Sequence, residues 1–319
     1  MNTILVTGAA GFIGSHLCEA LVARGDRVIG VDAFVPYYPR IWKQSNLAGL
    51  LQKDGFSFHE LDIRNDDLQP LVDTADVIVH LAAMPGLRQS WPEFQLYASC
   101  NVNGTQRVLE AAKAAGIDHF IHGSTSSVYG RQADGPESLP LQPVSPYGVT
   151  KLAAEHLCHA YGINFGLPLT VLRFFSVYGP RQRPDMAYTL LIDALVHEKP
   201  FTRFGDGEQT RSNTYVADIV NAVLRTIDHR DNVAGEILNI GGGEVISLNE
   251  AIAILEDLIQ RKVQITQQPG VPGDQKHTHA NIEKAGELLG YQPGTPVRDG
   301  LAAQIAWYCD ADVRVGNGS

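Results

Sequence analysis

Short apolar runs alternate with longer amphipathic segments through the first 175 residues of the chain. The runs are rich in Val, Ile and Leu, which is typical of strands buried on both faces of a parallel sheet. This alternation predicts an α/β fold with a doubly wound parallel sheet, whose ligand binds at the carboxyl ends of the strands. Strands are expected at residues 3–6, 27–31, 56–61, 76–80, 119–122 and 169–173, with helices between residues 14 and 25, at 92–115 and from 145 onward.

The regular alternation weakens after residue 175. Pro180, Pro184, Pro200 and a turn at residues 205–207 interrupt the next stretch. A chain of 319 residues is long enough for two lobes. We therefore expect a larger domain at residues 1–175 with a returning segment at about 213–240, and a smaller, mixed α/β C-terminal domain at 176–212 and 241–319.

A glycine-rich turn follows the first predicted strand. Gly8, Gly11 and Gly14 permit a tight turn, close approach of the backbone to a pyrophosphate, and close packing of helix on strand. Their spacing differs from the commoner Gly-x-Gly-x-x-Gly, but a strand precedes the turn and a helix follows it. Asp32 ends the second strand, where a carboxylate can bind both ribose hydroxyls of NAD and repel the phosphate of NADP. The turn predicts an NAD site, and a purely structural turn is the alternative.

Two further strand ends suit the same cofactor. Asp62 and Ile63 follow the third strand, where they can meet an adenine edge. Leu81, Ala82 and Ala83 follow the fourth strand and would let a cofactor lie close to the backbone.

Residues 145–151 combine a helix start with a candidate acid–base pair. Ser145 and Pro146 are typical of an N-cap and a first helical turn. Tyr147 and Lys151 are four residues apart and so lie one turn from each other on one helix face. An ammonium beside a phenol favours the phenolate and lowers its pKa, which gives a proton acceptor near neutral pH. Alone, such a pair is common, and an ordinary half-buried tyrosine beside a surface lysine is the alternative.

Composition and charge restrict the class of protein. The formal net charge is −10, which argues against a general nucleic-acid-binding surface. No apolar segment approaches membrane-spanning length, so we expect no membrane partner. Four scattered cysteines form no disulfide-dense or metal-ligand pattern, which favours a cytoplasmic protein without a metal site.

Five arginines gather where the regular alternation ends. They could bind a phosphate-bearing substrate, although five acids lie among them and surface charge is the alternative for most of them. The arginines are Arg173, Arg181, Arg183, Arg203 and Arg211.

Six motifs occur in order: residues 7–14, 62–63, 80–83, 101–105 and 124–130, then Tyr147-x-x-x-Lys151. In this order, and over nearly the whole chain, they resemble the extended short-chain dehydrogenase/reductase superfamily, in particular its nucleotide-sugar epimerases, dehydratases and decarboxylases. The resemblance implies a Rossmann sheet that binds NAD tightly and regenerates it in each cycle. It also implies catalysis by Thr125, Tyr147 and Lys151, and a homodimer formed through the helices near 92–115 and 147–162. The cofactor-binding residues that it implies are Gly8, Gly11, Phe12, Ile13, Gly14, Asp32, Lys43, Asp62, Ile63, Leu81, Ala82, Ala83, Asn101, Ser124, Tyr147, Lys151 and Phe174.

The two residues after Thr125 distinguish between the reactions that this family catalyses. Related 4,6-dehydratases carry Asp-Glu there, and UDP-glucuronate decarboxylases typically carry glutamate at the second position, whereas this chain has Ser126 and Ser127. Without an acid to drive elimination, epimerisation by oxidation and reduction remains. Residues 86–90 and 173–187 are similar to UDP-glucuronate 4-epimerases, which implies conversion of UDP-glucuronate to UDP-galacturonate through a 4-keto sugar.

Hydroxyl groups and arginines are expected to bind this UDP-sugar. Serine and threonine hydroxyls can donate to a hexuronate carboxylate, although Ser126 and Ser127 could instead cap a loop. The expected substrate-binding residues are Arg88, Thr125, Ser126, Ser127, Tyr147, Ser176, Arg181, Arg183, Arg211 and Asp274.

Two departures keep other functions open. Ser176 stands where galactose epimerases usually have asparagine, and Val271 breaks an Arg-x-x-Asp pattern that ends at Asp274. The nucleobase could therefore be thymine. A UDP-glucuronate decarboxylase and a neutral UDP-sugar 4-epimerase are alternatives, and a non-catalytic dinucleotide-binding sensor is a remote one.

Overall fold

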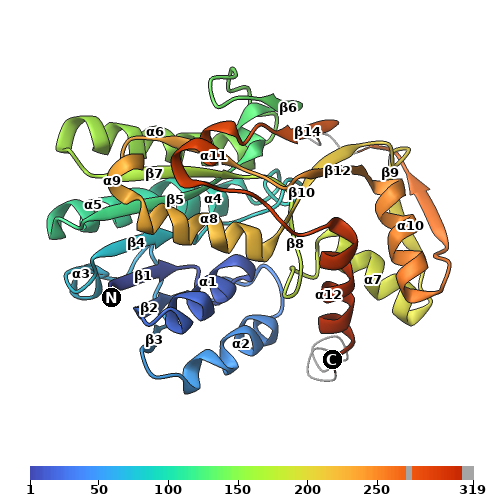
Figure 1. Ribbon diagram of the computed structural model, residues 1–319, viewed down its shortest axis with the longest axis horizontal. Coiled ribbons are helices and arrows are strands. Elements are labelled where there is room, and N and C mark those ends of the chain that lie inside the picture. Colours follow the sequence, from blue (N-terminus) through green and yellow to red (C-terminus); the bar gives the residue numbers. More distant parts are fainter. Residues whose placement is uncertain (271–274, 311–319) are drawn as a thin grey trace.

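A computed structural model describes residues 1–270 and 275–310. Its main sheet has seven strands in the order β11-β7-β5-β4-β1-β2-β3, and every neighbouring pair is parallel (Figure 1). The chain runs outward in one direction from β1 and in the other from β4, so the strand order reverses between them and opens a crevice at the carboxyl ends. The doubly wound fold is confirmed. The strands are β1 (Thr3–Thr7), β2 (Arg27–Val31), β3 (Phe56–His59), β4 (Val77–His80), β5 (His119–Thr125), β7 (Leu169–Phe174) and β11 (Ile237–Ile240).

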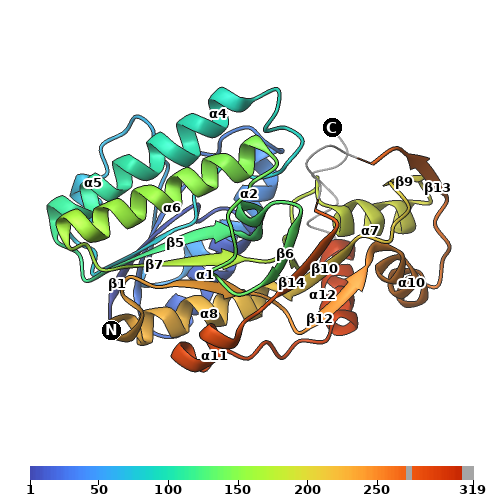
Figure 2. The same cartoon turned by 90° about the horizontal axis from the view of Figure 1, so that it is seen from above.

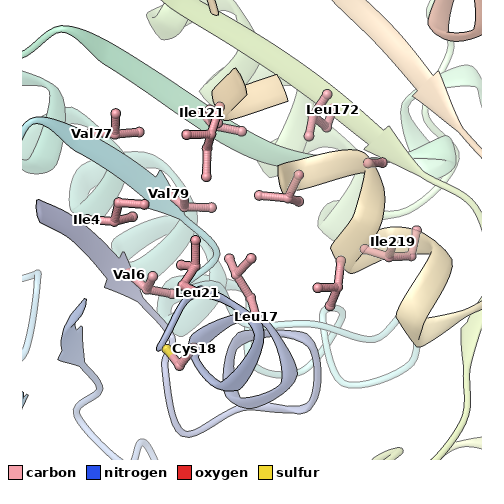
Figure 3. Close-up of a cluster of buried hydrophobic side chains, with 14 of the residues drawn as sticks. Ile4, Val6, Leu17, Cys18, Leu21, Val77, Val79, Ile121, Leu172 and Ile219 are labelled. Carbon is pink, nitrogen blue, oxygen red and sulfur yellow. The ribbon is translucent and has the colours of Figure 1, made fainter. Parts of the chain in front are cut away.

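Helices cover both faces of this sheet, as the continuous apolar strands predict. Figure 2 shows α5 and α6 on one side and α8 and α11 on the other. In Figure 3, Leu17 and Leu21 of α1 and Ile219 of α8 lie in one buried cluster with side chains of β1, β4, β5 and β7. The helices are α1 (Phe12–Ala23), α8 (Val216–Asp228) and α11 (Glu283–Leu289) on that face, and α3 (Gln69–Val72), α5 (Thr105–Ala115) and α6 (Pro146–Phe165) on the other.

A second group of elements stands beside the carboxyl end of the main sheet (Figure 1). It contains a sheet in the order β12-β10-β14-β6 with β8 added to β10, and a parallel pair β13-β9. The strands are β6 (Gln132–Gly135), β8 (Val177–Tyr178), β9 (Phe201–Phe204), β10 (Thr210–Tyr215), β12 (Glu244–Ser247), β13 (Ile265–Gln268) and β14 (His277–Ala280), and the helices are α7 (Ala187–His197), α10 (Leu248–Ile259) and α12 (Val297–Cys309).

Short helices complete the described chain: α2 (Arg40–Ala48), η1 (Leu50–Gln52), α4 (Phe94–Ala98), η2 (Ser99–Gly104), η3 (Ser126–Tyr129) and α9 (Arg230–Val233). The domain boundaries drawn from the sequence stay a prediction. The strand β11 lies in the returning segment and joins the main sheet, whereas β6 precedes residue 175 and joins the smaller one.

Helix α6 begins as the sequence predicts. The Ser145 hydroxyl accepts a hydrogen bond from the backbone N–H of Gly148 at 3.1 Å, and Pro146 occupies the first turn. Gly166 ends the helix in the left-handed conformation. These signals fix the register of the helix, and with it the height of Tyr147 and Lys151 above the sheet.

The predicted single helix at residues 92–115 is wrong in one respect. A π-helical turn, η2, separates α4 from α5. Within it, the Asn101 amide donates to Met84 O and to the Thr150 hydroxyl, and its oxygen accepts from Met84 N. A Cβ on Gly104 would lie 2.7 Å from Ile63 Cδ1, so the wide turn also presses close to the strand ends. Such turns are frequent at functional sites, and helical periodicity in the sequence does not reveal them.

A buried ion pair joins α6 to β7. Arg173 Nη2 lies 2.7 Å from Glu155 Oε2, and the side chains are 1% and 3% exposed. The Glu155 carboxylate also accepts from the Ser124 hydroxyl, and Arg173 donates to Tyr129 Oη at 2.8 Å. The pair is therefore hydrogen-bonded on both sides, as a buried pair must be to persist.

The state of the cysteines and the length of the helices are relevant to the cellular location of the protein. Cys18, Cys100 and Cys158 are buried free thiols, and Cys309 is a partly exposed one. Within the described ranges, no helix has both the length and the apolar composition that crossing a bilayer requires. A cytoplasmic location stays a prediction.

Three histidines lie in the middle of the main sheet. His80 on β4 and His119 and His122 on β5 are all buried. Burial lowers the pKa of His80 to about 3 and that of His119 to about 4, and it lowers the pKa of His122 well below 6.5. The folded protein therefore holds three neutral imidazoles.

We expect the free energy of unfolding to fall as the pH drops below 6.5. The unfolded chain then binds protons that the folded chain excludes, so each of the three histidines costs about 1.4 kcal/mol per pH unit until its folded pKa is reached. Urea unfolding at pH 7.5, 6.5 and 5.5 measures this slope. His119→Gln, which removes one of the three, should make it shallower, and an equal slope in this variant would contradict the explanation.

Candidate active site

Two adjoining cavities occupy the crevice at the carboxyl ends of the main sheet. The first measures about 440 Å³ and is lined by the turn after β1 and by the ends of β2, β4, β5 and β7, together with α6. The second measures about 910 Å³ and extends toward β9 and β10. They share walls that include Tyr37, Met84, Ser176, Arg183 and Arg211. The arrangement can hold an elongated ligand in each cavity, with the two meeting in the middle.

The glycine turn forms a bare backbone cradle in the first cavity. Gly8 has a φ of 74°, and a Cβ on it would lie 2.8 Å from Ala82 N. A Cβ on Gly14 would lie 2.1 Å from Gly8 O. Gly11 precedes α1 and supplies no side-chain cap, so the helix N-terminus faces the cavity uncovered. A dinucleotide pyrophosphate fits this cradle, because uncapped N–H groups and the helix dipole favour an anion.

A carboxylate stands at the next strand end. Asp32 is 7% exposed and lines the first cavity. Its Oδ1 accepts from Phe34 N at 2.8 Å and from Lys43 Nζ at 3.3 Å. These contacts fix the carboxylate while its second oxygen can accept ribose hydroxyls. The residues present therefore fit an NAD adenosine half.

The candidate acid–base pair lies at the far end of this cavity. Tyr147, Thr125 and Lys151 all line it. Burial raises the pKa of Tyr147 above its ordinary value, while a hydrogen bond with Thr125 and the charge of Arg183 act in the opposite direction. The Tyr147 phenol thus has a hydroxyl partner and a cation nearby, the two features that stabilise a phenolate when it forms.

Lys151 is held by two acceptors on the neighbouring strand β5. Its ammonium donates to Gly123 O at 2.6 Å and to His122 Nε2 at 3.3 Å, on the sheet side of the helix. Burial lowers the pKa of Lys151 to about 8. Arg183 is a second cation whose charge opposes the rise in the Tyr147 pKa, and the effect of Lys151 on that pKa stays a prediction.

Hydroxyl groups occupy the wall after β5. Thr125 Oγ1 lies 3.3 Å from Ser127 Oγ and accepts from Ser127 N at 3.2 Å. Ser126 and Ser176 line the same cavity. Gln275, whose amide donates to Ser126 O and Gly130 O, packs against them. This wall offers neutral donors to a bound carboxylate.

The arginines divide into two groups. Arg183 and Arg211 line both cavities, and Arg88 lines the second, where its guanidinium lies 3.7 Å from the Phe204 ring centroid. Arg183 is held by both oxygens of Asp185 at 3.0 Å. Arg181 faces α1 instead.

Two predicted residues stand apart from the cavities. Arg181, which has a φ of 65°, pairs with Glu19 at 2.7 Å and lines neither cavity, so it is not placed for a diphosphate. Asn101 supports the cavity wall from behind through its bonds to Met84 and Thr150. Asp274 lies outside the described residues. The other predicted cofactor and substrate residues line one cavity or both, including Phe12, Ile13, Asp62, Ile63, Leu81, Ala82, Ala83, Ser124 and Phe174.

Sequence reasoning missed Gln275, which lines the first cavity, and His122, which lies behind its wall inside β5. Gln275 directly follows Asp274, but nothing in the spacing of either residue predicts its role. Glu155 follows Lys151 by one helical turn, so its helix face could be predicted, but its partner Arg173 could not.

The chain is similar to a known family over most of its length. The model of the NAD dependent epimerase/dehydratase family matches residues 4–241. A protein of Bacillus subtilis (strain 168), YtcB, named as an uncharacterized UDP-glucose epimerase, is 46% identical over 95% of this chain and 97% of its own length. The UDP-glucuronate 4-epimerase of Thermodesulfobacterium geofontis (strain OPF15) is 37% identical over 96% of both chains.

Solved structures give the same picture. The crystal structure of UDP-glucuronic acid 4-epimerase from Bacillus cereus, in complex with UDP-glucuronic acid and NAD, superposes with a TM-score of 0.94 at 46% identity. The match covers 96% of this chain and 98% of that one.

We expect Gly14→Ala to abolish NAD retention. The new Cβ would meet Gly8 O at 2.1 Å, and this backbone atom cannot yield without opening the cradle. Chromatography of NAD released from the denatured, purified protein measures the occupancy. Gly243→Ala is the matched control, because nothing lies within 4 Å of its added Cβ. NAD bound to Gly14→Ala in the wild-type amount would contradict the role of the turn.

Proposed function

The chain belongs to the NAD dependent epimerase/dehydratase family, and we propose that it is a 4-epimerase that interconverts UDP-glucuronate and UDP-galacturonate. One observation carries the proposal: Thr125, Tyr147 and Lys151 meet the glycine-turn cavity beside a wall of hydroxyls that holds no carboxylate after Thr125. The likeness over nearly the whole chain to the Bacillus cereus enzyme supports it.

NAD would occupy the first cavity. Its pyrophosphate would lie on the turn at Gly8, Gly11 and Gly14, and its adenosine ribose against Asp32. Asp62 suits the adenine end, where hydrogen bonds from Arg64 hold the pKa of its carboxyl below the ordinary range. When bound, NAD accepts a hydride from the sugar and later returns it.

Proton transfer falls to the chain's own residues. The Tyr147 phenolate takes the proton of the sugar 4-hydroxyl, and the Thr125 hydroxyl bonds the same oxygen. The positive charges of Lys151 and Arg183 favour the phenolate form of Tyr147 during this transfer. Tyr147 then returns the proton after the 4-keto sugar has turned over, so the reaction has no net proton or redox change.

The hydroxyl wall beside Thr125 would bind the carboxylate of the acid sugar without promoting its loss as carbon dioxide. Ser126, Ser127 and Ser176 donate hydrogen bonds without adding a negative charge that would repel the substrate. Arg88 lines the second cavity and Arg211 lines both, so these arginines suit the diphosphate and the nucleoside. The missing carboxylate at Ser127 disfavours decarboxylation.

A neutral-sugar epimerase is the second candidate. YtcB, which is named as a UDP-glucose epimerase, is as similar to this chain as the Bacillus cereus enzyme is. The products formed from UDP-glucuronate and from UDP-glucose separate the two candidates.

The epimerase proposal is tested by incubating the purified protein with UDP-glucuronate, UDP-glucose and UDP-galactose, and separating the products by chromatography with mass detection. We expect a product of unchanged mass from UDP-glucuronate, and a kcat for Tyr147→Phe that is lower by about 10² to 10⁴. Tyr161→Phe, on the same helix but outside both cavities, should stay active. Loss of carbon dioxide, preference for a neutral sugar, or a fully active Tyr147→Phe would each overturn the proposal.

We also propose that two chains form a dimer through the outer face formed by α4, α5 and α6. Phe94 of α4 and Val149 and Ile163 of α6 are 43%, 49% and 69% exposed, and Figure 2 shows α4, α5 and α6 along one side of the molecule. Burying such side chains in a twofold contact favours association.

Light scattering should therefore give a mass of about twice that of one chain. Ile163→Glu places a charge in the contact and should lower the mass toward one chain. Leu51→Glu alters a side chain that is 54% exposed on η1, away from this face, and should leave the mass unchanged. A monomeric wild type would refute the dimer.

A further inference from the structure

A buried imidazole that the proposed chemistry does not use lies directly behind Lys151. His122 on β5 is fully buried, and its Nε2 lies 3.3 Å from Lys151 Nζ. Its other ring nitrogen, Nδ1, is buried and has no hydrogen-bond partner within the part of the chain that the structure describes. Buried polar atoms are rarely left in this state.

The Lys151 contact fixes the tautomer of His122. An ammonium only donates hydrogen bonds, so Nε2 must accept, and the single proton of the neutral ring must reside on Nδ1. That proton is the unpartnered one. The adjacent His80 differs, because Thr7 and Thr105 bind its two nitrogens at 2.7 and 3.0 Å. The fold therefore leaves one side of His122 unsatisfied while offering the other side to Lys151.

The two sheet-side acceptors leave Lys151 one donor for the cavity. Lys151 has three N–H groups, of which one goes to Gly123 O and one to His122. The third can face the cavity that the lysine lines. His122 and Gly123 O thus hold the ammonium from below, one helical turn from Tyr147.

We propose that His122 is a positioning residue that keeps Lys151 in its ammonium form and directed at the reaction centre. The inference deepens the proposed function, because it concerns the charge beside the catalytic tyrosine. Removing an acceptor from a buried charged group favours the neutral form of that group. Lys151 without His122 would therefore lose its proton at a lower pH.

Other groups around Lys151 do not replace this acceptor. Tyr147, Glu155 and Cys158 lie on its own helix, and His80 faces it from β4. Glu155 is already paired with Arg173, and burial keeps Cys158 protonated by raising its pKa to about 12. His80 has both nitrogens occupied. Burial lowers the pKa of Lys151 to about 8, so a small further decrease would bring this pKa to neutral pH.

The test compares His122→Leu, which removes the acceptor, with His122→Gln, whose amide oxygen can take the place of Nε2. His119→Leu is the matched control, because His119 is a buried histidine on the same strand that bonds Thr170 instead. The first measurement is an NMR pH titration of the full, NAD-loaded protein carrying [13Cε]lysine, with the Lys151 signal assigned from Lys151→Arg.

We expect the Lys151 midpoint to fall by about one pH unit in His122→Leu, to recover largely in His122→Gln, and to stay in place in His119→Leu. The second measurement is the pH profile of kcat with UDP-glucuronate. Its alkaline limb should shift to lower pH by the same amount in His122→Leu, with KM changed less than about twofold.

An unmoved Lys151 midpoint in His122→Leu would overturn the proposal, as would an equal shift in His119→Leu. A kcat that falls equally at every pH would assign His122 a structural role only. The NMR titration needs no turnover, so a wild type that fails to epimerise UDP-glucuronate would refute the proposed function and leave the His122 result readable.

Discussion

The buried pair between Arg173 and Glu155 is the contact on which the geometry of the site depends. It ties α6 to β7 in a region where water cannot replace either partner, so each charge requires the other. Ser124, one residue before Thr125, bonds the same carboxylate. One ion pair therefore connects the helix that carries Tyr147 and Lys151 with the strand end that carries Thr125. A sheet alone fixes its strands, but it does not fix the height of a helix above them.

The main sheet could be predicted because its causes are local. Each strand is a short apolar run, and Gly8, Gly11 and Gly14 permit a turn that few other residues allow. The start of α6 could be predicted for the same reason, since Ser145 and Pro146 act on the adjacent turn. Most residues that line the cavities could be predicted as well, because the carboxyl ends of the strands in a doubly wound sheet meet at one edge.

What could not be predicted depends on long-range contacts. Arg181 resembles a phosphate-binding arginine in the sequence, yet its left-handed backbone and Glu19 turn it toward α1. Asn101 fits a cofactor motif, yet it lines neither cavity, and its amide bonds Met84 and Thr150 instead. Arg183, thirty-six residues farther along the chain, also places a positive charge near Tyr147. In each case the partner is set by packing, which no spacing rule encodes.

The route of the chain through the two sheets also restricts how such an enzyme can change its substrate. Strand β6 belongs to the smaller sheet, yet it is inserted between Thr125 and Tyr147. Strand β11 returns to the main sheet from the later part of the chain. A single genetic crossover therefore cannot exchange one lobe as a module. Point substitution of lining residues, in contrast, can change the substrate while it leaves proton transfer and cofactor binding in place.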